Sequence, residues 1–292
     1  MIQTTAFALD ALKRPSGAFA MLAVDQREAM RQMFAAHQST PVSDQQVTDF
    51  KLRATKILTP YASAVLVDRQ FAWEQVVARE AVHPRCGLIA AGDEFIAGDD
   101  EIVGDVIIDQ AMIPERVREQ GAVAMKLLVL WRPDEAPDAR VAMVRDFVAR
   151  CRRAGLVSII EPISRKPRNG GDFDWNAGVH AAAKELGNLG ADLYKAEVPL
   201  KGEGDEKTLR DECARLTKAI ASPWVVLSSG VTQDRFPQAV EWACREGASG
   251  FLAGRAVWSG VIGANDIDQA LLQDAVPRLQ RLCDVVDRVV GQ

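Results

Sequence analysis

Short apolar segments rich in β-branched residues alternate along this chain with longer segments in which apolar residues recur every three or four positions. The first pattern is typical of strands buried in a parallel sheet, and the second of amphipathic helices that cover such a sheet. Strand-like segments occur at residues 17–25, 61–68, 86–93, 122–131, 156–163, 191–199, 224–230 and 250–257. Eight strands that alternate with helices close most simply into a (β/α)8 TIM barrel.

Glycines mark the ends of several predicted helices. A glycine stands one to three residues before a predicted strand, where a helix commonly ends, at positions 121, 155, 190 and 247. A doubly wound open sheet shows the same alternation, but it needs a glycine-rich turn after its first strand, and Asp25-Gln26-Arg27 follows here. We therefore predict one barrel domain over residues 1–292.

Composition and charge argue against several other classes of protein. The chain carries 35 Lys+Arg against 40 Asp+Glu, a net charge of −5, which disfavours nucleic acid as a partner. No apolar segment reaches the roughly 18 residues that a membrane helix requires, so we expect no membrane partner. The apolar run before Asp25 leads into charged residues without the cleavage pattern of a signal peptide, and we expect a cytoplasmic protein.

Cysteine and histidine are sparse. The five cysteines and three histidines are scattered, without the spacing of metal ligands or of a disulfide framework. We therefore expect reduced cysteines in the core, no metal site and no bound cofactor. Any chemistry must then come from the side chains of the chain itself.

The candidates for chemistry are polar side chains at the carboxyl ends of the strands, because a barrel of this kind has its active site there. Segment 191–199 contains Lys195, and the alternation of side chains places Lys195 and Glu197 on one face, with Tyr194 on the other. A lysine is rarely buried without a task, and an imine with a ketone is the use that suits it. The alternative is a core salt bridge between Lys195 and Glu197.

A second lysine, Lys126, lies in segment 122–131 and is also expected to be buried. Imine formation requires the neutral amine, and burial and a neighbouring cation both favour that form. Lys126 is therefore expected to assist Lys195. The alternative is that Lys126 is the structural partner of a carboxylate.

Two carboxylates accompany the lysines. Pro162 is expected to stop its strand directly after Glu161, which leaves Glu161 at the rim of the barrel. From there Glu161 can pass protons during imine formation and aldol cleavage, or it can merely neutralise a lysine. Asp25 ends segment 17–25 and can orient a lysine or a substrate hydroxyl, or cap the helix that begins near Arg27.

Small residues end the last two predicted strands. Ser228, Ser229 and Gly230 end one of them, and Gly254 with Arg255 lies near the end of the other. Barrels bind phosphate at this place through backbone N–H groups, and a guanidinium adds positive charge. The pattern therefore predicts an anion site in preference to simple tight turns.

Further positive charge is expected near the mouth of the barrel. Arg165 lies in a basic loop after segment 156–163, and Arg27 and Arg53 occur early in the chain, with Gln26 beside Arg27. These residues are candidates for substrate contact or for a second anion. The alternative is a solvated surface, which is the commoner fate of charged runs.

An imine lysine, a neighbouring carboxylate, a second lysine and an anion site together suit the reversible aldol cleavage of a phosphorylated ketose. The protonated imine accepts the electron pair of the breaking bond, so no metal is needed. The alternative from another class is a barrel that binds a sugar phosphate without turnover.

Five segments carry a family resemblance: AMLAVDQRE (20–28), KLLVLWR (126–132), SIIEP (158–162), ADLYK (191–195) and GFLAGRAVW (250–258). They resemble the class I aldolases of the tagatose-bisphosphate aldolase type over nearly the whole chain. The likeness is closest to the sulfoglycolytic branch, which cleaves 6-deoxy-6-sulfofructose 1-phosphate into dihydroxyacetone phosphate and 3-sulfolactaldehyde. Cleavage of tagatose or fructose 1,6-bisphosphate is the alternative.

The resemblance implies that Lys195 is the Schiff-base lysine and Glu161 the proton shuttle, with Asp25 and Lys126 as a supporting polar pair. It also implies that the residues after the last two strands hold an anion, either the phosphate or the sulfonate, and that the protein is a homo-oligomer. Departures from the family lie at the N-terminus, in the acidic loop 93–105 and in the C-terminal tail.

Overall fold

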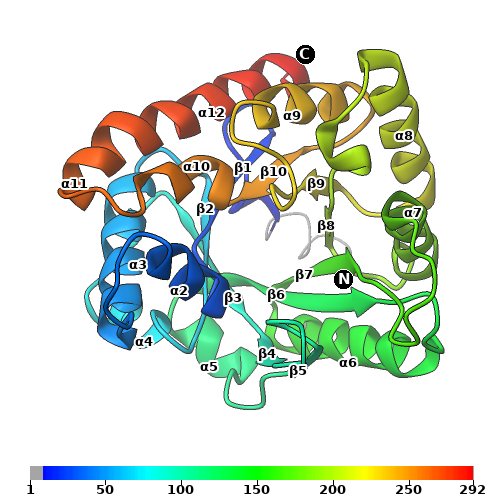
Figure 1. Cartoon of the computed structure of the whole chain (residues 1–292), viewed down its shortest axis with the longest axis horizontal. Helices are drawn as coiled ribbons and strands as arrows, with labels where there is room; N and C mark the ends of the chain where they lie inside the picture. Colours follow the sequence, from blue (N-terminus) through cyan, green and yellow to red (C-terminus); the bar gives the residue numbers. More distant parts are fainter. Residues whose placement is uncertain (1–8, 292) are drawn as a thin grey trace.

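The computed structural model describes residues 9–291 and contains a closed barrel of eight parallel strands surrounded by helices (Figure 1). Around the barrel the strands follow in the order β1, β2, β3, β6, β7, β8, β9, β10, and β10 pairs with β1. They span Phe19–Ala23, Ala64–Val67, Gly87–Ala91, Ala122–Trp131, Val157–Ser164, Leu193–Ala196, Trp224–Val226 and Gly250–Ala253 in that order. Each overlaps a predicted segment, so the predicted barrel is confirmed; residues 1–8 and 292 of the predicted domain lie outside the described residues.

Helices form the outer layer of the barrel (Figure 1). Those between the strands are α2 Glu28–Ala35, α3 Asp44–Leu58, α4 Trp73–Ala78, α5 Pro114–Glu119, α6 Asp138–Ala154, α7 Trp175–Leu186, α8 Glu206–Ala219 and α9 Phe236–Arg245. After β10 come α10 Arg255–Trp258, α11 Ile267–Ala270 and α12 Val276–Val290. As predicted, a glycine ends α6: Gly155 has a left-handed φ of 70°.

The interior of the barrel is filled by side chains from alternate positions of the strands. Its buried apolar residues are Leu12, Phe19, Met21, Ala23, Ala64, Leu66, Ile89, Ala91, Ala124, Val157, Ile159, Leu193, Val225 and Leu252. On five strands, the next inward-facing residue toward the carboxyl end is charged. These residues are Asp25, Asp93, Lys126, Glu161 and Lys195. The inward-facing side chains of the strands therefore form an apolar interior and, at the mouth of the barrel, a layer of charged groups.

Strand β7 runs through Pro162 to Ser164, so the predicted stop at this proline is wrong. The amide of Ser164 points toward β8, because it donates to the carboxylate of Glu197 just after that strand. Pro162 lies two residues earlier, so its nitrogen faces the same side. Backbone pairing between β7 and β8 ends at Ile160, and the missing N–H of Pro162 leaves no ladder bond unmade.

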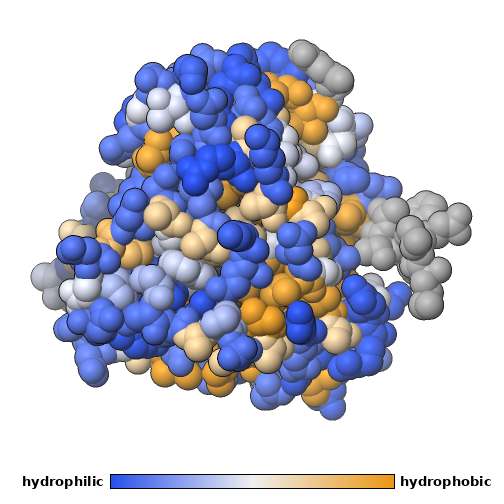
Figure 2. Space-filling view, turned by 90° about the vertical axis from the view of Figure 1, so that its right-hand side faces the viewer, coloured by the Kyte–Doolittle hydropathy of each residue, from blue (hydrophilic) through white to orange (hydrophobic). Residues whose placement is uncertain are grey.

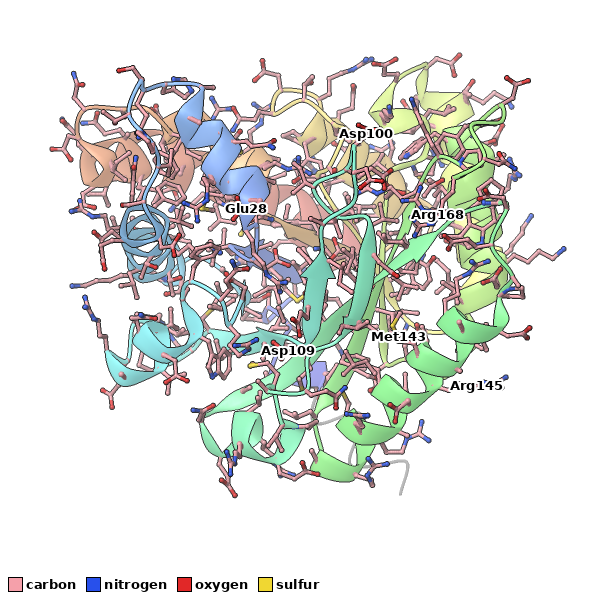
Figure 3. All side chains as sticks on the ribbon, turned by 60° about the horizontal axis from the view of Figure 1, so that its bottom comes forward. Glu28, Asp100, Asp109, Met143, Arg145 and Arg168 are labelled. Carbon is pink, nitrogen blue, oxygen red and sulfur yellow. The ribbon has the colours of Figure 1, made fainter. Side chains whose placement is uncertain are left out.

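An antiparallel hairpin, β4 Asp93–Ile96 and β5 Asp105–Ile108, occupies the segment expected to be an acidic loop. In Figure 3 it extends from Asp109 at its base to Asp100 at its tip. Strands of four residues with charged ends give little alternation to recognise, which is why the sequence did not predict them.

The hairpin packs one of its faces against the mouth of the barrel. Val106 and Phe95 join an apolar cluster with Leu128 and Ile163 of the barrel strands. The opposite face is open to solvent, and Ile96 is 43% exposed. The hairpin is therefore a cover over the carboxyl ends of the strands.

The cysteines, the apolar character of the helices and the surface are the remaining features for which the composition gave expectations. All five cysteines are buried and unbridged, as predicted. Among residues 9–291, no helix combines the length and apolar character needed to cross a bilayer. Figure 2 shows the side of the molecule that carries α7 and α8, where the surface is mainly hydrophilic with separate apolar patches.

We predict that Gly250→Ala strongly destabilises the barrel. Gly250 has a φ of 137°, and a Cβ there would lie 1.9 Å from the carbonyl oxygen of Phe19 in the paired strand β1. Backbone cannot yield as a flexible side chain can, so we expect a loss of about 3 kcal/mol or more in the free energy of unfolding. Urea denaturation measures this loss.

The control for this prediction is Gly170→Ala. Gly170 also has a positive φ, 74°, but a Cβ there meets nothing within 4 Å. Gly170→Ala should lose only about 1 kcal/mol of the free energy of unfolding, which is the cost of a positive φ for a residue with a side chain. Equal losses in the two variants would contradict the steric explanation.

Candidate active site

A cavity of about 260 Å³ opens at the carboxyl ends of the strands. Its lining includes the candidates Asp25, Gln26, Arg27, Lys126, Glu161, Arg165, Ser229 and Arg255. Hairpin residues Phe95 and Val103 also line it. The cavity therefore lies where barrel active sites are found.

Glu161 contacts both buried lysines. Its Oε1 lies 2.7 Å from the Nζ of Lys195, and its Oε2 lies 3.1 Å from the Nζ of Lys126. Lys195 is only 3% exposed and does not line the cavity itself, whereas Glu161 does. Lys195 points into the barrel because it continues the inward parity of Leu193, while Tyr194 packs in the outer core, as predicted.

Lys126 is surrounded by carboxylates. Its Nζ lies 2.8 Å from Asp25, 2.9 Å from Asp93 and 3.1 Å from Glu161. Burial acts to lower the pKa of Lys126, but the three carboxylates raise it well above its ordinary value. Lys126 is therefore a partner of carboxylates, as the alternative interpretation expects, and its part in catalysis stays a prediction. The expectation that it acts on Lys195 as a bare like charge needs correction, because its charge is compensated.

Asp25 belongs to this cluster and does not cap the helix that follows it. Helix α2 begins without any side-chain cap, with Arg27 at its N-cap position. Asp25 instead contacts Lys126 and accepts a hydrogen bond of 3.1 Å from the Gln26 amide. Burial acts to raise the pKa of Asp25, but the charges of Lys126 and Lys195 lower it below its ordinary value. Asp25 is therefore a fixed negative charge.

Asp93 is a member of the cluster that the sequence argument missed. It is 1% exposed, contacts Lys126 at 2.9 Å and accepts the backbone N–H of Leu128 at 2.9 Å. The signal was present, because Asp93 ends segment 86–93 and follows the inward residues Ile89 and Ala91 in parity. The same alternation that identified Lys195 would have found it.

Arg27 is held rigidly beside Asp93. Its Nη2 donates to the Oδ1 of Asp93 at 2.7 Å, and its guanidinium lies 3.9 Å from the centre of the Phe95 ring. Its Nε is 4.0 Å from Asp68, which also pairs with the fully buried Lys51 of α3. Neither Asp68 nor Lys51 was predicted, since a lysine in an amphipathic helix gives no sign of burial.

Glu197 has a different partner from the one considered in the sequence. Lys195 pairs with Glu161, and Glu197 accepts the N–H of Ser164 at 2.7 Å. Burial raises the pKa of Glu197 to about 7, although the Ser164 hydrogen bond opposes the shift. Glu197 thereby holds the start of the loop that carries Arg165.

The predicted anion site consists of two turns beside the cavity. The hydroxyl of Ser228 accepts the N–H of Ala256 at 3.4 Å, which joins the turns after β9 and β10. A Cβ at Gly254 would lie 2.3 Å from the carbonyl oxygen of Ala23, so only glycine fits there. Burial lowers the pKa of Arg255 somewhat, with Glu161 and Asp25 acting in the opposite direction.

Ser229 and Arg255 reach the cavity lining, while Ser228, Gly230 and Gly254 shape the adjoining backbone. Their roles in binding stay predictions. Because the turns combine small residues with one guanidinium at the mouth, they provide the features expected of an anion site.

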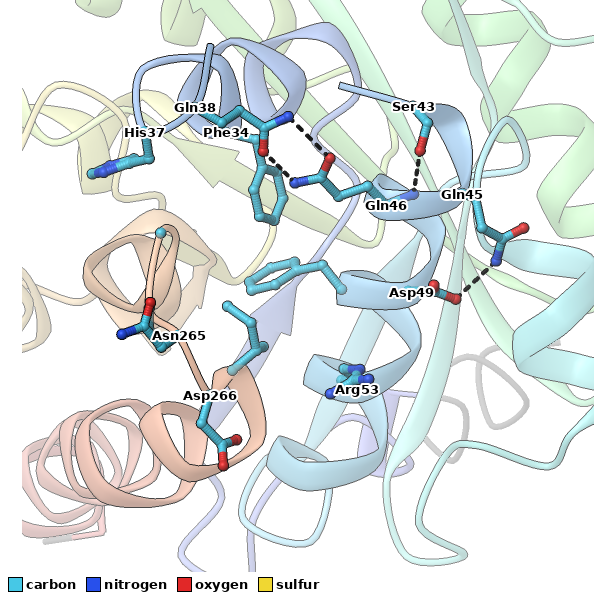
Figure 4. A pocket seen from close by; sticks show the side chains of 14 residues that line it. Phe34, His37, Gln38, Ser43, Gln45, Gln46, Asp49, Arg53, Asn265 and Asp266 are labelled. Atoms are coloured by element: carbon cyan, nitrogen blue, oxygen red, sulfur yellow. Dashed lines mark hydrogen bonds between the residues drawn. The ribbon is translucent and has the colours of Figure 1, made fainter. Parts of the chain in front are cut away.

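Arg165 and Arg53 were both expected to contact substrate, but they lie in different parts of the structure. Arg165 lines the cavity, and its buried Nε has no hydrogen-bond partner among the described residues. Arg53 lies on the outer face of α3, pairs with Asp268 at 3.1 Å and lines a separate depression near Phe34 and His37 (Figure 4). The nomination of Arg53 is corrected, because its helix turns it away from the barrel mouth.

The described part of the chain contains no group of three or more His, Cys, Asp or Glu side chains arranged to hold a metal ion. The described side chains offer a buried amine, that of Lys195, 2.7 Å from the carboxylate of Glu161, which reaches the cavity. Such a pair can form a covalent bond to a carbonyl and move the protons that the reaction requires.

The sequence matches a family model described as DeoC/LacD family aldolase over residues 19–260. A curated relative, the tagatose 1,6-diphosphate aldolase of Listeria monocytogenes serotype 4a (strain HCC23), is 31% identical over 288 residues, 89% of this chain and 83% of the relative. The enzyme of that name from Staphylococcus aureus (strain JH9) is 27% identical over 280 residues, 87% of this chain and 84% of its own.

Solved structures share the fold at lower sequence identity. An archaeal fructose 1,6-bisphosphate aldolase superposes with a TM-score of 0.67 at 16% identity, covering 98% of this chain and 99% of its own. A second archaeal structure, with its catalytic lysine bound to the carbinolamine intermediate of its substrate, gives 0.65 at 15% identity, covering 97% and 99%.

We predict that Glu197 makes the protein less stable as the pH rises toward neutrality. Because the pKa of Glu197 is raised to about 7 in the folded protein, the folded state holds the proton that the unfolded state has already released. Its contribution to the free energy of unfolding is therefore complete at pH 4, is lost as the pH rises toward about 7, and is constant above pH 8.

Glu197→Gln tests this, because the amide oxygen still accepts the Ser164 N–H but does not titrate. Between pH 5 and pH 8, urea denaturation should show that the wild type loses about 2 kcal/mol more than the variant. Glu115→Gln, at an exposed position of α5, is the control and should follow the wild type. Parallel pH profiles for wild type and Glu197→Gln would refute the prediction.

Proposed function

Because this chain belongs to the DeoC/LacD family of aldolases, we propose that it cleaves a phosphorylated ketose reversibly through an imine on Lys195. The observation that carries the proposal is the 2.7 Å contact between the buried Lys195 amine and Glu161, which lines the cavity. The amine supplies the nucleophile and the carboxylate supplies the proton transfers that an imine requires.

The surroundings of the two lysines support Lys195 as the nucleophile. Lys126 is within 3.1 Å of three carboxylates, which raise its pKa and keep it a protonated ammonium that cannot attack a carbonyl. Lys195 is within 4 Å of one carboxylate, that of Glu161, among the described residues. The neutral form of the Lys195 amine stays a prediction.

Imine formation begins with attack of the Lys195 nitrogen on the ketone carbon. The new C–N bond forms as the carbonyl π electrons move to oxygen, and Glu161, which holds the proton released by the Lys195 amine, gives that proton to the oxygen. The Glu161 carboxylate then takes one proton from the nitrogen, which leaves the neutral carbinolamine, and returns it to the hydroxyl, which leaves as water. The nitrogen lone pair forms the C=N bond of the protonated imine, and Glu161 is again a carboxylate. Glu161 can serve each transfer because it already contacts the nitrogen.

Cleavage then breaks the carbon–carbon bond next to the imine. A carboxylate removes the proton of the substrate hydroxyl, the carbonyl of the departing aldehyde forms, and the bonding electron pair moves into the imine to give an enamine. Protonation of the enamine carbon and addition of water release the ketone and restore Lys195. Asp25 and Lys126 are fixed charges beside this path, and we assign them orientation of the substrate hydroxyls.

A ketohexose 1,6-bisphosphate is the substrate that the relatives favour. The curated relatives carry the name tagatose 1,6-diphosphate aldolase, and the match covers 89% of this chain. One phosphate would bind the turns that hold Ser229 and Arg255, where backbone and guanidinium groups can donate to its oxygens. The carbonyl carbon would then lie toward Lys195.

A 6-sulfonated ketose 1-phosphate is the second candidate, and the charges at the mouth favour it in one respect. Arg27 is already bonded to Asp93, so its charge is largely compensated. Arg165 has an unpartnered buried nitrogen and no ion pair within 4 Å among residues 9–291. One uncompensated guanidinium suits the single charge of a sulfonate better than the double charge of a phosphate.

We predict that borohydride traps dihydroxyacetone phosphate on Lys195. Reduction of the imine should add a stable adduct to the peptide that contains this residue, measured by mass spectrometry after digestion. Lys195→Met should form no adduct and lose at least about 10³-fold in cleavage rate. Lys184→Met, at an exposed position of α7, is the matched control and should behave like the wild type.

An adduct on Lys126, or none on any lysine, would refute the mechanism. A Lys195→Met variant that folds, binds the sugar phosphate and cleaves as fast as the wild type would likewise exclude the imine. A wild-type protein that binds the sugar phosphate without any cleavage would support the third possibility, a binding protein without turnover.

A separate measurement decides between the two substrates. If the bisphosphate is the substrate, kcat/KM for tagatose or fructose 1,6-bisphosphate should exceed that for 6-deoxy-6-sulfofructose 1-phosphate by tenfold or more, on the order of 1.4 kcal/mol. The reverse ratio would establish the sulfonated ketose. Arg165→Met should reduce the preference for whichever group Arg165 contacts.

A further inference from the structure

A completely buried ion pair joins helix α3 to the end of strand β2. Lys51 of α3 and Asp68, the residue after β2, are each 0% exposed, and the Nζ of Lys51 contacts the Oδ1 of Asp68. The other oxygen of Asp68 accepts the N–H of Phe71 at 2.9 Å. Neither Lys51 nor Asp68 lines the cavity. A buried ion pair is often no better for stability than apolar groups, so this one calls for a reason other than folding.

Arg27 lies between this ion pair and the charged cluster of the candidate active site. Its Nη2 donates to the Oδ1 of Asp93 at 2.7 Å and to the backbone carbonyl of Asp93 at 2.8 Å. Its Nε lies 4.0 Å from the Oδ2 of Asp68, and this buried nitrogen has no hydrogen-bond partner among the described residues. Arg27 therefore faces two carboxylates and is hydrogen-bonded to one of them.

The charge of Lys51 explains why Arg27 is bonded to Asp93. Asp68 already has a cation on one oxygen and an N–H on the other, so it attracts the guanidinium less strongly. Asp93 in turn contacts Lys126 through its second oxygen, at 2.9 Å. Without Lys51, Asp68 would be an unpaired charge in the interior, and the guanidinium 4.0 Å away is placed to neutralise it.

A shift of Arg27 would reach Lys195 through shared side chains. With one partner fewer, Asp93 would draw Lys126 closer and away from Glu161. Glu161 contacts Lys126 at 3.1 Å and Lys195 at 2.7 Å, so a weaker contact with Lys126 lets it bind Lys195 more firmly. A firmer ion pair favours the ammonium form of Lys195, whereas attack on a ketone needs the neutral amine.

We propose that Lys51 and Asp68 are positioning residues for the reaction at Lys195. Lys51 neutralises Asp68, and Arg27 is thereby left to Asp93. The proposal rests on the proposed function and adds to it two residues that touch neither the substrate nor the reacting atoms. Side chains of alternating charge then run from α3 to the reactive amine, in the order Lys51, Asp68, Arg27, Asp93, Lys126, Glu161 and Lys195.

The test separates kcat from KM in Lys51→Met. Met keeps the length of the lysine side chain but removes its charge. With tagatose 1,6-bisphosphate or 6-deoxy-6-sulfofructose 1-phosphate, whichever the wild type cleaves, kcat should fall roughly tenfold. KM should stay within about twofold of the wild type, because the cavity lining is unchanged. Lys56→Met, at an exposed position of the same helix, is the matched control and should match the wild type in both constants.

A second substitution distinguishes positioning from a merely structural role. Asp68→Asn removes the carboxylate that would capture Arg27, and its amide oxygen can still accept the N–H of Phe71. Asp68→Asn alone should lose less kcat than Lys51→Met, because burial lowers the pKa of Lys51 and favours its neutral form once Asp68 is gone. The double variant Lys51→Met/Asp68→Asn should recover kcat to within about threefold of Asp68→Asn. A structural role predicts that the two losses add.

Three results would overturn the proposal: a wild-type kcat in Lys51→Met, a change confined to KM, or a double variant slower than either single variant. Lys51→Gln replaces Lys51→Met if the latter does not fold, because its amide can still donate to Asp68 without a charge. Lys51→Gln should also lower kcat and leave KM unchanged, and a wild-type kcat in this variant would equally contradict the positioning role.

Crystal structures of the variants separate this proposal from the imine. Arg27 should be bonded to Asp68 in Lys51→Met and to Asp93 in the double variant. If the wild type cleaves neither ketose, the proposed function fails, while a movement of Arg27 from Asp93 to Asp68 in Lys51→Met still supports its placement by Lys51. Arg27 bonded to Asp93 in Lys51→Met as in the wild type would overturn the proposal, whether or not the imine forms.

Discussion

The bridge that Glu161 forms between two buried lysines is the interaction on which the rest of the polar centre depends. One oxygen of the carboxylate contacts Lys195 and the other contacts Lys126. A move of Glu161 toward either lysine would weaken its contact with the other. The positions of both amines are therefore coupled through one side chain that also faces the cavity.

The charges of this centre are costly to bury and therefore have to be matched closely. Lys126 is compensated by Asp25, Asp93 and Glu161, and Arg27 in turn is compensated by Asp93. Replacing such a cluster by apolar groups is often neutral for stability, whereas removing a single member leaves an unpaired charge in a dry interior. The cluster is accordingly better explained by the chemistry that we propose for it than by any contribution to folding.

Much of this arrangement follows from the period-two alternation of buried strands. That rule placed Lys195, Glu161 and Asp25 on inward faces, and it would have placed Asp93 there had it been applied to the third strand. Lys126 was found instead from its place within an apolar segment. The family resemblance then gave these positions roles. What alternation cannot supply is the partner of a charge, since partners come from other strands and depend on side-chain length.

The features that were predicted wrongly or missed have local physical causes. Arg53 was nominated for its charge alone, and its position on the outer face of a helix decided otherwise. Pro162 was expected to end a strand, but its nitrogen faces a side where pairing has already stopped. The left-handed backbone of Leu200 and Lys201, shortly after β8, gave no signal in the sequence, because neither of these two residues is a glycine. The N–H of Leu200 donates to the side-chain oxygen of Asn176 in α7, and this contact holds the conformation.

The tip of the hairpin over the cavity closes on itself. Gly98 and Gly104 approach so closely that a Cβ on Gly104 would lie 2.5 Å from the Cα of Gly98. The residues between them form a loop whose ends almost touch, and Ile102 and Val103 of that loop reach the cavity. Natural variation or engineering can therefore replace this loop by one of another length and leave the charged side chains below it undisturbed.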